Sequence, residues 1–402
     1  MRTSSLVGLA LVLIFAALPP ARAAKYYYVG GPPPPGVSGD DSWRWRASGI
    51  QEAYDDIQAT GSGDWDIRVH ADYQQDVGAG NIELALGTVA VNRVQGAMTW
   101  TTGAAGVGPL GAAQDLSNKS EVTGSGANVI NIHNEVLTLD GFTIHGPALI
   151  RNNAGGTVVM NCHVSGDGTG AGIYIGDNNH KVYVMNTLVE GFEHGIRYLD
   201  NVSTRTTYVV HSTIADNATG ISNDQAPWEG RLHFYNAVIA ADNIPVDETN
   251  NKRVYSYCDV YDGDGSFDFD GTADAAGVYD INLDGTSIRQ DPQLQPDFTL
   301  GGGPCVDSGG VEDGGTFLYV NVDSPTDFNP DTDVVVAGTP PPNARYVILT
   351  DIDGNARVQG AGPDMGASEG GSLAAPIPEP GGCVLFATAL FGLRRRKRGR
   401  GG

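Results

Sequence analysis

VYVMNTLVEGFEHGIRYL at residues 182–199 and TYVVHSTIADNATGISN at residues 207–223 are two copies of one pattern. In each copy a short apolar run is followed by a small polar residue and then by further short apolar runs. Aromatic and β-branched residues in short runs, separated by Gly, Asn and Asp, are typical of β-strands joined by turns. The pattern therefore predicts two or three short strands per copy, with no helix between them.

Two sets of positions repeat with one period between residues 128 and 251. The first set consists of the alternating pairs Leu137/Leu139, Val158/Met160, Val182/Val184, Tyr208/Val210 and Leu232/Phe234, whose second members are separated by 21, 24, 26 and 24 residues. A small polar turn residue follows each pair: Asp140, Asn161, Asn186, Ser212 and Asn236. The second set is Leu149, Ile173, Ile196, Ile221 and Val246, with spacings of 24, 23, 25 and 25 residues.

A period near 24 residues without helices predicts a coil that rises by one strand spacing per turn. The inward side chains of one turn then stack on those of the next, about 4.8 Å away. Asn and Asp tolerate left-handed backbone and bond neighbouring backbone groups, so they can form ladders at the bends. Ordering each residue of a turn costs roughly 1.5 kcal/mol, so one turn is stable only when neighbouring turns stack on both of its sides. The first and last turns lack a neighbour on one side, and both ends of the stack therefore need covers.

Residues 48–69 are predicted to supply the first cover. Ile50, Tyr54 and Ile57 share one face of a short helix. Ser48 is the expected N-cap and Gly61 the expected stop, and a strand is expected at 67–69. The segment YYYVGG…GDDSWRWRA before the helix reads as a strand and a turn. Tyr and Trp residues in it are expected to pack in the entry strand, although sugar stacking is an alternative.

This entry region resembles that of the right-handed parallel β-helix proteins of the pectate-lyase-like superfamily. Such proteins often begin with a YYV strand, a GDDSW-like turn and an IQ-A capping helix. The resemblance implies a right-handed parallel β-helix with a short N-terminal capping helix and an irregular C-terminal cap.

The other end of the body resembles bacterial surface β-helix proteins of the choice-of-anchor group. The matching residues are Asp291-Pro292, Phe298-Thr299-Leu300, Pro304-Cys305-Val306-Asp307, Asp351-Ile352-Asp353-Gly354 with Arg357, and Asp364-Met365-Gly366-Ala367 with Glu369. Gly303 and Ser368 depart from the usual residues of that group. We interpret this signature as structural: Asp307 and Asp364 bond turn backbone, and Arg357 pairs with Glu369 or Asp351 where the chain folds over the last coil.

The two termini predict export and sorting. Arg2, an apolar stretch from Leu6 to Leu18 and Ala21-Arg22-Ala23 have the build of a secretory signal peptide cleaved after Ala23. The tail resembles the PEP-CTERM sorting signal: Pro378-Glu379-Pro380, a short apolar run and an Arg cluster. The Gly-Gly-Cys before the run is also reminiscent of a related Cys-containing tail family. This implies signal peptidase and an exosortase-type enzyme as processing partners, transient membrane contact, and a place in the envelope, on the outer surface or in the matrix of a bacterium.

Charge and cysteine content narrow the function classes. Eight of the 24 basic residues lie in the two terminal segments, which leaves 16 against 47 acidic residues and a net charge near −31. Such a surface repels nucleic acid. It also repels polyanionic polysaccharide unless divalent cations intervene. Besides Cys383 in the tail there are three cysteines, of which Cys162 is expected to be a buried thiol, whereas Cys258 and Cys305 could pair.

The sequence offers few candidates for catalysis. Polysaccharide lyases of the superfamily use a Lys or Arg to abstract a proton beside a uronate carboxylate, often with calcium. Arg197 is the best match, because alternation with Ile196 turns it outward near Glu193 and His194. A solvated rim explains these three residues equally well. The hydrolase motifs NTD and RIK are absent from the sequence, and His180, His194 and His211 are expected at the surface or in turns.

One loop carries four carboxylates: Asp262, Asp264, Asp268 and Asp270 in YDGDGSFDFDGTAD. Calcium accepts flexible oxygen ligands of this kind, although the loop lacks the terminal Glu of an EF-hand. A structural calcium site is one interpretation, and a solvated acidic loop is the other. No cofactor is required by either.

The sequence therefore predicts five segments: a signal peptide (1–23), an entry strand with capping helix and first coils (24–125), parallel β-helix coils (126–300), a C-terminal cap (301–372) and a sorting tail (373–402). The first functional hypothesis is a non-catalytic envelope or matrix protein with a structural, adhesive or carbohydrate-binding role. The second is a calcium-assisted polysaccharide lyase or another carbohydrate-active enzyme acting on uronate-containing polysaccharide.

Overall fold

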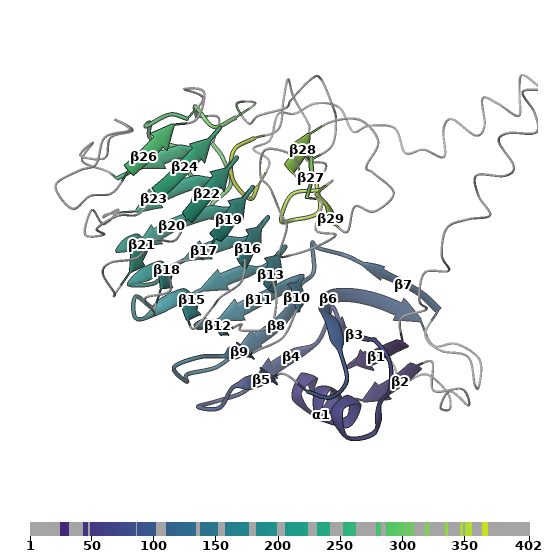
Figure 1. Ribbon diagram of the computed structural model, residues 1–402. Helices are drawn as coiled ribbons and strands as arrows, with labels where there is room; N and C mark the ends of the chain where they lie inside the picture. Colours follow the sequence, from purple (N-terminus) through teal and green to yellow (C-terminus); the bar gives the residue numbers. More distant parts are fainter. Residues whose placement is uncertain are drawn as a thin grey trace, which may run out of the picture. The chain divides into compact units, whose positions relative to one another are not determined.

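The chain enters three parallel β-sheets in turn, as the computed structural model shows (Figure 1). The structure describes residues 25–31, 43–46, 49–85, 87–101, 110–133, 137–151, 157–176, 182–198, 206–223, 231–241, 252–262, 279–282, 287–301, 303–306, 308, 318–320, 334–336, 346–348, 350–355 and 364–368. All of them belong to one unit, Met1–Gly370. Among these residues no helix has the length and apolar character needed to cross a membrane.

The first sheet has twelve strands. In order across the sheet they are β2 (Trp43–Arg46), β1 (Lys25–Val29), β3 (Trp65–His70), β6 (Val91–Thr101), β10 (Thr138–Asp140), β13 (Thr157–Met160), β16 (Val182–Met185), β19 (Thr206–Val210), β22 (Arg231–Tyr235), β24 (Lys252–Ser256) and β26 (Tyr279–Asn282). The twelfth, β7 (Leu110–Gln114), pairs antiparallel with β6, and the other pairs of this sheet are parallel.

The second and third sheets are wholly parallel. The second contains β25 (Asp259–Tyr261), β23 (Val238–Ala241), β20 (Thr213–Asn217), β17 (Leu188–Glu190), β14 (His163–Ser165), β11 (Phe142–His145), β8 (Ser120–Thr123) and β4 (Gln74–Asp76). The third contains β21 (Thr219–Asn223), β18 (His194–Tyr198), β15 (Ala171–Gly176), β12 (Ala148–Arg151), β9 (Ile130–His133) and β5 (Ile82–Ala85). A small antiparallel sheet consists of β28 (Val334–Val336), β27 (Leu318–Val320) and β29 (Tyr346–Ile348).

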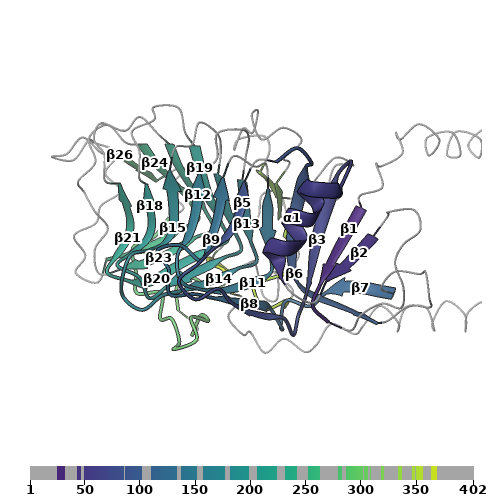
Figure 2. The same cartoon turned by 90° about the horizontal axis from the view of Figure 1, so that it is seen from below.

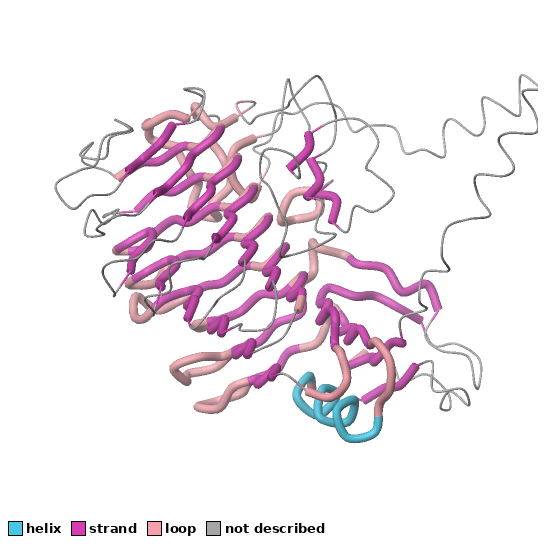
Figure 3. The backbone as a smooth tube through the Cα atoms, in the orientation of Figure 1, coloured by secondary structure: helices cyan, strands magenta, loops and turns pink. Residues whose placement is uncertain are grey.

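From β10 to β23 the chain visits the first, second and third sheets in strict rotation, so each strand pairs with the one three places further along (Figures 1 and 2). We call one such passage a three-strand repeat. The single α-helix of the described residues lies outside it (Figure 3). The expectation of an all-β fold with parallel sheets is confirmed.

The helix α1 (Ile50–Thr60) has the predicted apolar face, with Ile50, Ala53, Tyr54 and Ile57 buried. It packs against β1, β3 and β5. Gly61 ends it as predicted, donating its N–H to the Ile57 carbonyl at 2.7 Å. The prediction of Ser48 as N-cap was wrong: Gly49 holds that position and no side chain caps the helix. The segment before the helix contains two paired strands, β1 and β2, where one strand and a turn were expected.

One hydrophobic core runs through the three sheets and α1. In the first sheet it contains a row of mutually paired residues, Leu139, Val159, Val184, Val209, Phe234 and Tyr255, separated by 20 to 25 residues. The predicted pairs Val158/Met160 and Tyr208/Val210 were therefore displaced by one residue. The reason is that both faces of these strands are buried, so apolar residues occupy neighbouring positions and no alternation marks the inner face.

The row in the third sheet also differs by one residue at its start. Ile173, Ile196 and Ile221 are paired as predicted, but Ala148, and not Leu149, is in register with Ile173. Val246 lies outside the described residues. Ala148 is buried, with 2 % of its surface exposed, but its side chain is small. For that reason a pattern of large apolar residues did not include this position.

A ladder of polar side chains connects the bends between the first and second sheets. Asn161 donates its Nδ2 to Asp140 Oδ1 at 2.6 Å, and Asn186 donates its Nδ2 to Asn161 Oδ1 at 2.7 Å. Asn236 Nδ2 lies 3.3 Å from His211 Nε2. Asn161, Asn186, His211 and Asn236 all have φ between 47° and 54°. The predicted ladder is confirmed for Asp140, Asn161 and Asn186, and a further pair joins His211 and Asn236. In that pair His211, a buried bend residue, holds the position expected for Ser212.

Segments near the C-terminal end of the described residues lie along the second sheet. Ile352 and Ala367 pack on Leu188 of β17, and Met365 packs on Val238 of β23. The Gly366 N–H donates to the Asn236 carbonyl at 2.7 Å. The described signature residues contact several three-strand repeats, whereas we expected them over the last one. Arg357, Asp307 and Glu369 lie outside the described residues.

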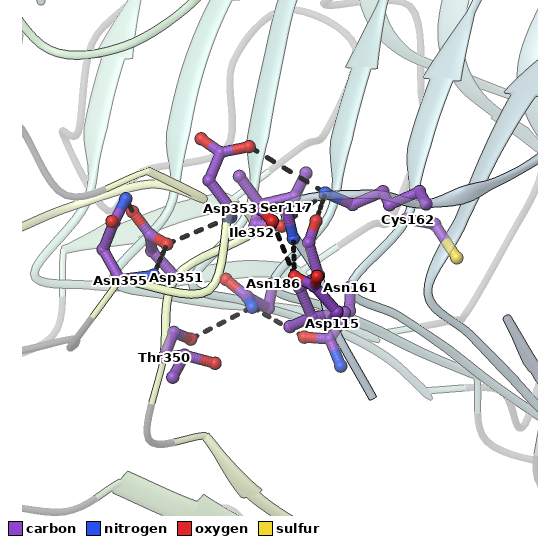
Figure 4. A network of polar contacts seen from close by, with 12 residues as sticks. Asp115, Ser117, Asn161, Cys162, Asn186, Thr350, Asp351, Ile352, Asp353 and Asn355 are labelled. Carbon is purple, nitrogen blue, oxygen red and sulfur yellow. Dashed lines mark hydrogen bonds and ion pairs between the residues drawn. The ribbon is translucent and has the colours of Figure 1, made fainter. Parts of the chain in front are cut away.

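Asp351 organises this segment, as Figure 4 shows. Its Oδ1 accepts the backbone N–H groups of Asp353 and Asn355 at 3.0 and 2.7 Å, and its Oδ2 accepts Asn355 Nδ2 at 3.0 Å. The turn presents the Thr350 carbonyl to Asn186 Nδ2 at 3.1 Å. Arg357, the predicted partner of Asp351, lies outside the described residues. The carboxylate oxygens of Asp351 accept N–H groups of the turn.

The three described cysteines are buried free thiols. The alternative that Cys258 and Cys305 pair is thus not realised: Cys305 Sγ donates to Asp259 Oδ2 at 3.0 Å. Burial raises the pKa of Asp259 to about 6, although Cys305 and the Gln290 N–H, which donates to Oδ1 at 3.0 Å, partly oppose this.

Asp259→Asn should change how stability depends on pH. Between pH 4 and about 6 the folded chain holds a proton on Asp259 that the unfolded chain has released. The contribution of this group to stability therefore falls as the pH rises through that window. Because asparagine does not ionise, the variant should gain in unfolding free energy relative to the wild type on going from pH 4 to pH 7, as measured by chemical denaturation at both values.

Asp167→Asn is the matched control. Hydrogen bonds from the Thr169 side chain and backbone lower the pKa of this exposed carboxylate, so most of its pH-dependent effect falls below pH 4. The difference between Asp167→Asn and the wild type should therefore change little between pH 4 and pH 7. A difference between Asp259→Asn and wild type that does not vary with pH would contradict the assignment.

Candidate functional site

A cavity of about 490 Å³ lies where the second sheet turns into the third. It is lined by Thr123, Gly124, Ser125, Gly126, Ala127, His145, Gly146, Pro147, Ser165, Gly166, Asp167, Thr169, Gly170, Tyr174 and Phe192. Glycine is required at two of these bends. Gly146 has φ +124°, and a Cβ on Gly166 would lie 2.5 Å from the Phe192 ring. The bends after β8, β11 and β14 therefore carry glycines without side chains. The cavity lies beside these three bends.

Three successive strands of the second sheet carry a chain of ionisable and hydroxyl groups at this cavity. His145 of β11 pairs in register with Ser165 of β14, and Glu121 lies on β8. His145 Nδ1 is 2.7 Å from Ser165 Oγ, and His145 Nε2 is 3.2 Å from Glu121 Oε1. Alternation along the strands places all three side chains on the outer face, because Val122, Ile144 and Val164 are in the core.

The direction of these hydrogen bonds follows from the chemistry of the groups. An ionised carboxylate only accepts, so in neutral His145 the proton is on Nε2 and is donated to Glu121. Nδ1 then has a free lone pair and accepts the hydroxyl proton of Ser165. Gln74 Nε2 donates to Glu121 Oε2 at 3.1 Å and fixes the carboxylate. The Glu121 and His145 side chains are 35 % and 42 % exposed, so solvent and solutes reach the group.

A second histidine–carboxylate pair lies beside the first. His163 Nε2 is 3.0 Å from Glu190 Oε1 on the outer face of the same sheet. Burial lowers the pKa of His163, and the hydrogen bond and charge of Glu190 partly offset this. Ser165 and Glu190 are in register, but the Glu190 carboxylate contacts His163. The Ser165 hydroxyl is therefore left to His145.

The C-terminal segment contributes Ile352, Asp353, Ala367 and Ser368 to the lining of a smaller cavity of about 240 Å³ on this face. Lys119 donates to the carbonyls of Leu116 and Ile352 and lies 3.9 Å from Asp353 Oδ1. Burial lowers the pKa of Lys119, and the nearby Asp353 carboxylate partly opposes this. Because Lys119 holds the segment by its backbone, we assign it a structural role.

The residues predicted for catalysis lie elsewhere. Glu193 is at the bend before β18, and His194 is its first residue; His194 Nε2 is 3.9 Å from Glu193 Oε1. Arg197 is half-buried while Ile196 is in the core, so the predicted outward orientation is confirmed. The Glu193 side chain is 58 % exposed. Arg197 pairs in register with Tyr174, which lines the large cavity.

The other predicted sites fall mostly outside the described residues. These are the processing residues Ala23, Pro378, Glu379 and Pro380, and the carboxylates Asp264, Asp268 and Asp270. Asp262, directly after β25, is buried. Within the described part of the chain no three His, Cys, Asp or Glu residues cluster as a metal site.

Sequence reasoning missed Glu121, His145 and Ser165. They are 24 and 20 residues apart along the chain, and each occupies the outer face of a different strand. The only available signal was a polar residue at the outward position in successive repeats, which a solvated surface also produces.

No family model, curated protein or solved structure matches this chain.

Proposed function

We propose that this chain is an exported bacterial envelope or matrix protein that binds carbohydrate in the cavity between the second and third sheets. The observation that carries the proposal is the lining of that cavity. Hydroxyl groups of Ser125, Ser165 and Thr169, the imidazole of His145 and the ring of Tyr174 border one hollow. Saccharides are bound by such a combination, because hydroxyl groups need polar partners and the sugar faces need an aromatic surface.

The proposal also covers the detailed type of fold. We propose that the three sheets form a right-handed parallel β-helix of the pectate-lyase-like kind, with α1 as its N-terminal cap and a choice-of-anchor type C-terminal region. Supporting this are the strict rotation of strands through three sheets and the core shared along the rows. A stack of this type offers a long surface on which turns present binding groups.

Cellular placement rests on the two terminal segments. We propose that signal peptidase cleaves after Ala23 and that an exosortase-type enzyme acts near Pro378-Glu379-Pro380, with transient membrane contact through the tail. The acidic body then reaches the cell surface or matrix. Its charge disfavours nucleic acid as a partner.

Calcium is the cation we propose for the loop that begins at Asp262. It would also let an acidic protein bind uronate-containing saccharides, because a divalent ion bridges carboxylates of both partners. Calcium-assisted lyase activity is the second candidate function. It is favoured by the register of Arg197 with Tyr174 at the edge of the cavity.

Saccharide binding can be tested by calorimetric titration of the purified protein with neutral and uronate-containing oligosaccharides, with and without calcium. Tyr174→Ala should weaken binding about tenfold, which corresponds to about 1.4 kcal/mol. Tyr261→Ala, on β25 and outside the cavity lining, should leave affinity unchanged. Asp264→Ala should alter only the calcium-dependent component.

Failure of every saccharide to bind, or equal affinity of the Tyr174→Ala variant and the wild type, would refute the proposed function. The absorbance of unsaturated uronate ends, followed in the same samples, tests the lyase alternative. Its increase with time would replace simple binding by that activity.

A further inference from the structure

We propose that Ser165 is a nucleophile for the hydrolysis of acyl esters, with His145 as its general base and Glu121 as the group that orients the imidazole. The observation behind this is the directional chain Ser165 Oγ–His145 Nδ1–Glu121 Oε1, with distances of 2.7 and 3.2 Å. A hydroxyl, an imidazole and a carboxylate in this order have the roles of a hydrolytic triad, whichever fold carries them. Here the two imidazole nitrogens are exchanged relative to the serine-protease arrangement, with Nδ1 facing the hydroxyl and Nε2 facing the carboxylate.

The surroundings meet the other requirements of such a site. Ser165 and His145 border the cavity of about 490 Å³, so a substrate can reach the hydroxyl. Gln74 donates to Oε2 of Glu121, the carboxylate oxygen that His145 does not contact. The Glu190 carboxylate, which is in register with Ser165, contacts His163. Glu190 therefore does not compete with His145 for the hydroxyl proton of Ser165. Tyr174 lines the same cavity, and its hydroxyl is a donor of the type that stabilises a developing oxyanion.

The reaction balances with water as the only co-reactant. Ser165 Oγ attacks the ester carbonyl carbon, and its proton passes to His145 Nδ1. The bond from the carbonyl carbon to the alcohol oxygen then breaks, and His145 returns the proton to that oxygen. Water attacks the resulting acyl-serine, its proton passes through His145 to Ser165 Oγ, and the carboxylic acid leaves. Each cycle converts one ester and one water into one acid and one alcohol.

The substrate class follows from charge and from the cavity, and it rests on the proposed function. The body carries many more acidic than basic residues, which disfavours anionic esters and favours neutral ones. A cavity that takes a saccharide and places a nucleophile at its wall suits an O-acylated sugar. We therefore assign O-acetylated neutral saccharides as the substrate class.

The experiment uses the purified full chain and two probes that need no saccharide recognition. p-Nitrophenyl acetate reports ester cleavage, and a fluorophosphonate followed by peptide mass spectrometry reports the nucleophile. Wild type should cleave the ester and carry the label on Ser165. Ser165→Ala should lose both signals. Glu121→Gln should lower the rate about a hundredfold, the lower range for loss of an oriented base, with unchanged far-UV circular dichroism.

Ser308→Ala is the matched control, because Ser308 is exposed to solvent and lies outside the cavity lining; it should keep wild-type rate and labelling. A folded wild type that neither cleaves the ester nor accepts the label would overturn the proposal, as would undiminished cleavage by Ser165→Ala.

Acetylated and unacetylated oligosaccharides separate this inference from the proposed function. Saccharide binding without ester cleavage or Ser165 labelling would refute the role of Ser165 as a nucleophile and leave the proposed binding function standing. Labelling of Ser165 without binding of any saccharide would refute the binding function and leave Ser165 as a nucleophile.

Discussion

Phe234→Ala is expected to lower the free energy of unfolding by about 3–5 kcal/mol, the range for truncating a buried aromatic side chain. Phe234 is 2 % exposed and lies between Val209 and Tyr255 in the paired row of the first sheet. Its ring stacks on Tyr255 with centroids 4.9 Å apart and planes inclined by 12°. Removing the ring leaves a cavity between neighbouring repeats that the flanking strands cannot close, because both are fixed by backbone pairing.

The measurement is chemical denaturation followed by far-UV circular dichroism. Tyr174→Ala is the control: this aromatic residue is only half-buried on the outer face of β15, and its loss should cost less than about 1 kcal/mol. Equal destabilisation by the two substitutions would show that the row through Phe234 is not the centre of the core.

Asn186→Ala is the second substitution with a large expected effect, a loss of about 3–5 kcal/mol. Asn186 is fully buried, and its Nδ2 donates to both Asn161 Oδ1 and the Thr350 carbonyl. Alanine leaves these two acceptors unsatisfied, at about 1–3 kcal/mol each. It also places a Cβ-bearing residue without a polar side chain at φ +49°.

Asn186→Gly separates the two causes. Glycine adopts positive φ at no steric cost, so this variant should be about 1 kcal/mol more stable than Asn186→Ala while still losing the hydrogen bonds. Asn81→Ala, at an exposed position, should change stability by less than about 0.5 kcal/mol. If Asn186→Ala has the same free energy of unfolding as the wild type in the same denaturation experiment, the ladder does not stabilise the fold.

The fold class was predictable because its signal is repeated. Asn161, Asn186 and Asn236 recur at bends where side-chain type and backbone conformation agree, and three consecutive isoleucines of the third sheet were placed correctly. His211 was missed in the ladder because its neighbour Ser212 was taken as the bend residue; in the structure the His211 Nε2 atom lies beside the Asn236 amide, where another amide would serve. The inner faces of β13 and β19 could not be chosen, since burial of both faces removes the period-two signal.

The candidate site was hidden for a different reason. Glu121, His145 and Ser165 come together only through strand register, and the intervening loops differ in length. Gln74, which holds Glu121, is 47 residues away. A histidine, a serine and a glutamate at such spacings form no motif. By contrast, Arg197 attracted notice because it follows Ile196 and lies within four residues of Glu193 and His194 in the sequence, which says little about how side chains meet on a sheet.

A crystal structure of this protein tests the central claim most directly. We predict that Leu139, Val159, Val184, Val209 and Phe234 occupy one straight row on successive parallel strands, with neighbours about 4.8 Å apart and the chain advancing through three sheets in a right-handed sense. Two antiparallel sheets packed face to face, or a helix between residues 130 and 250, would contradict it.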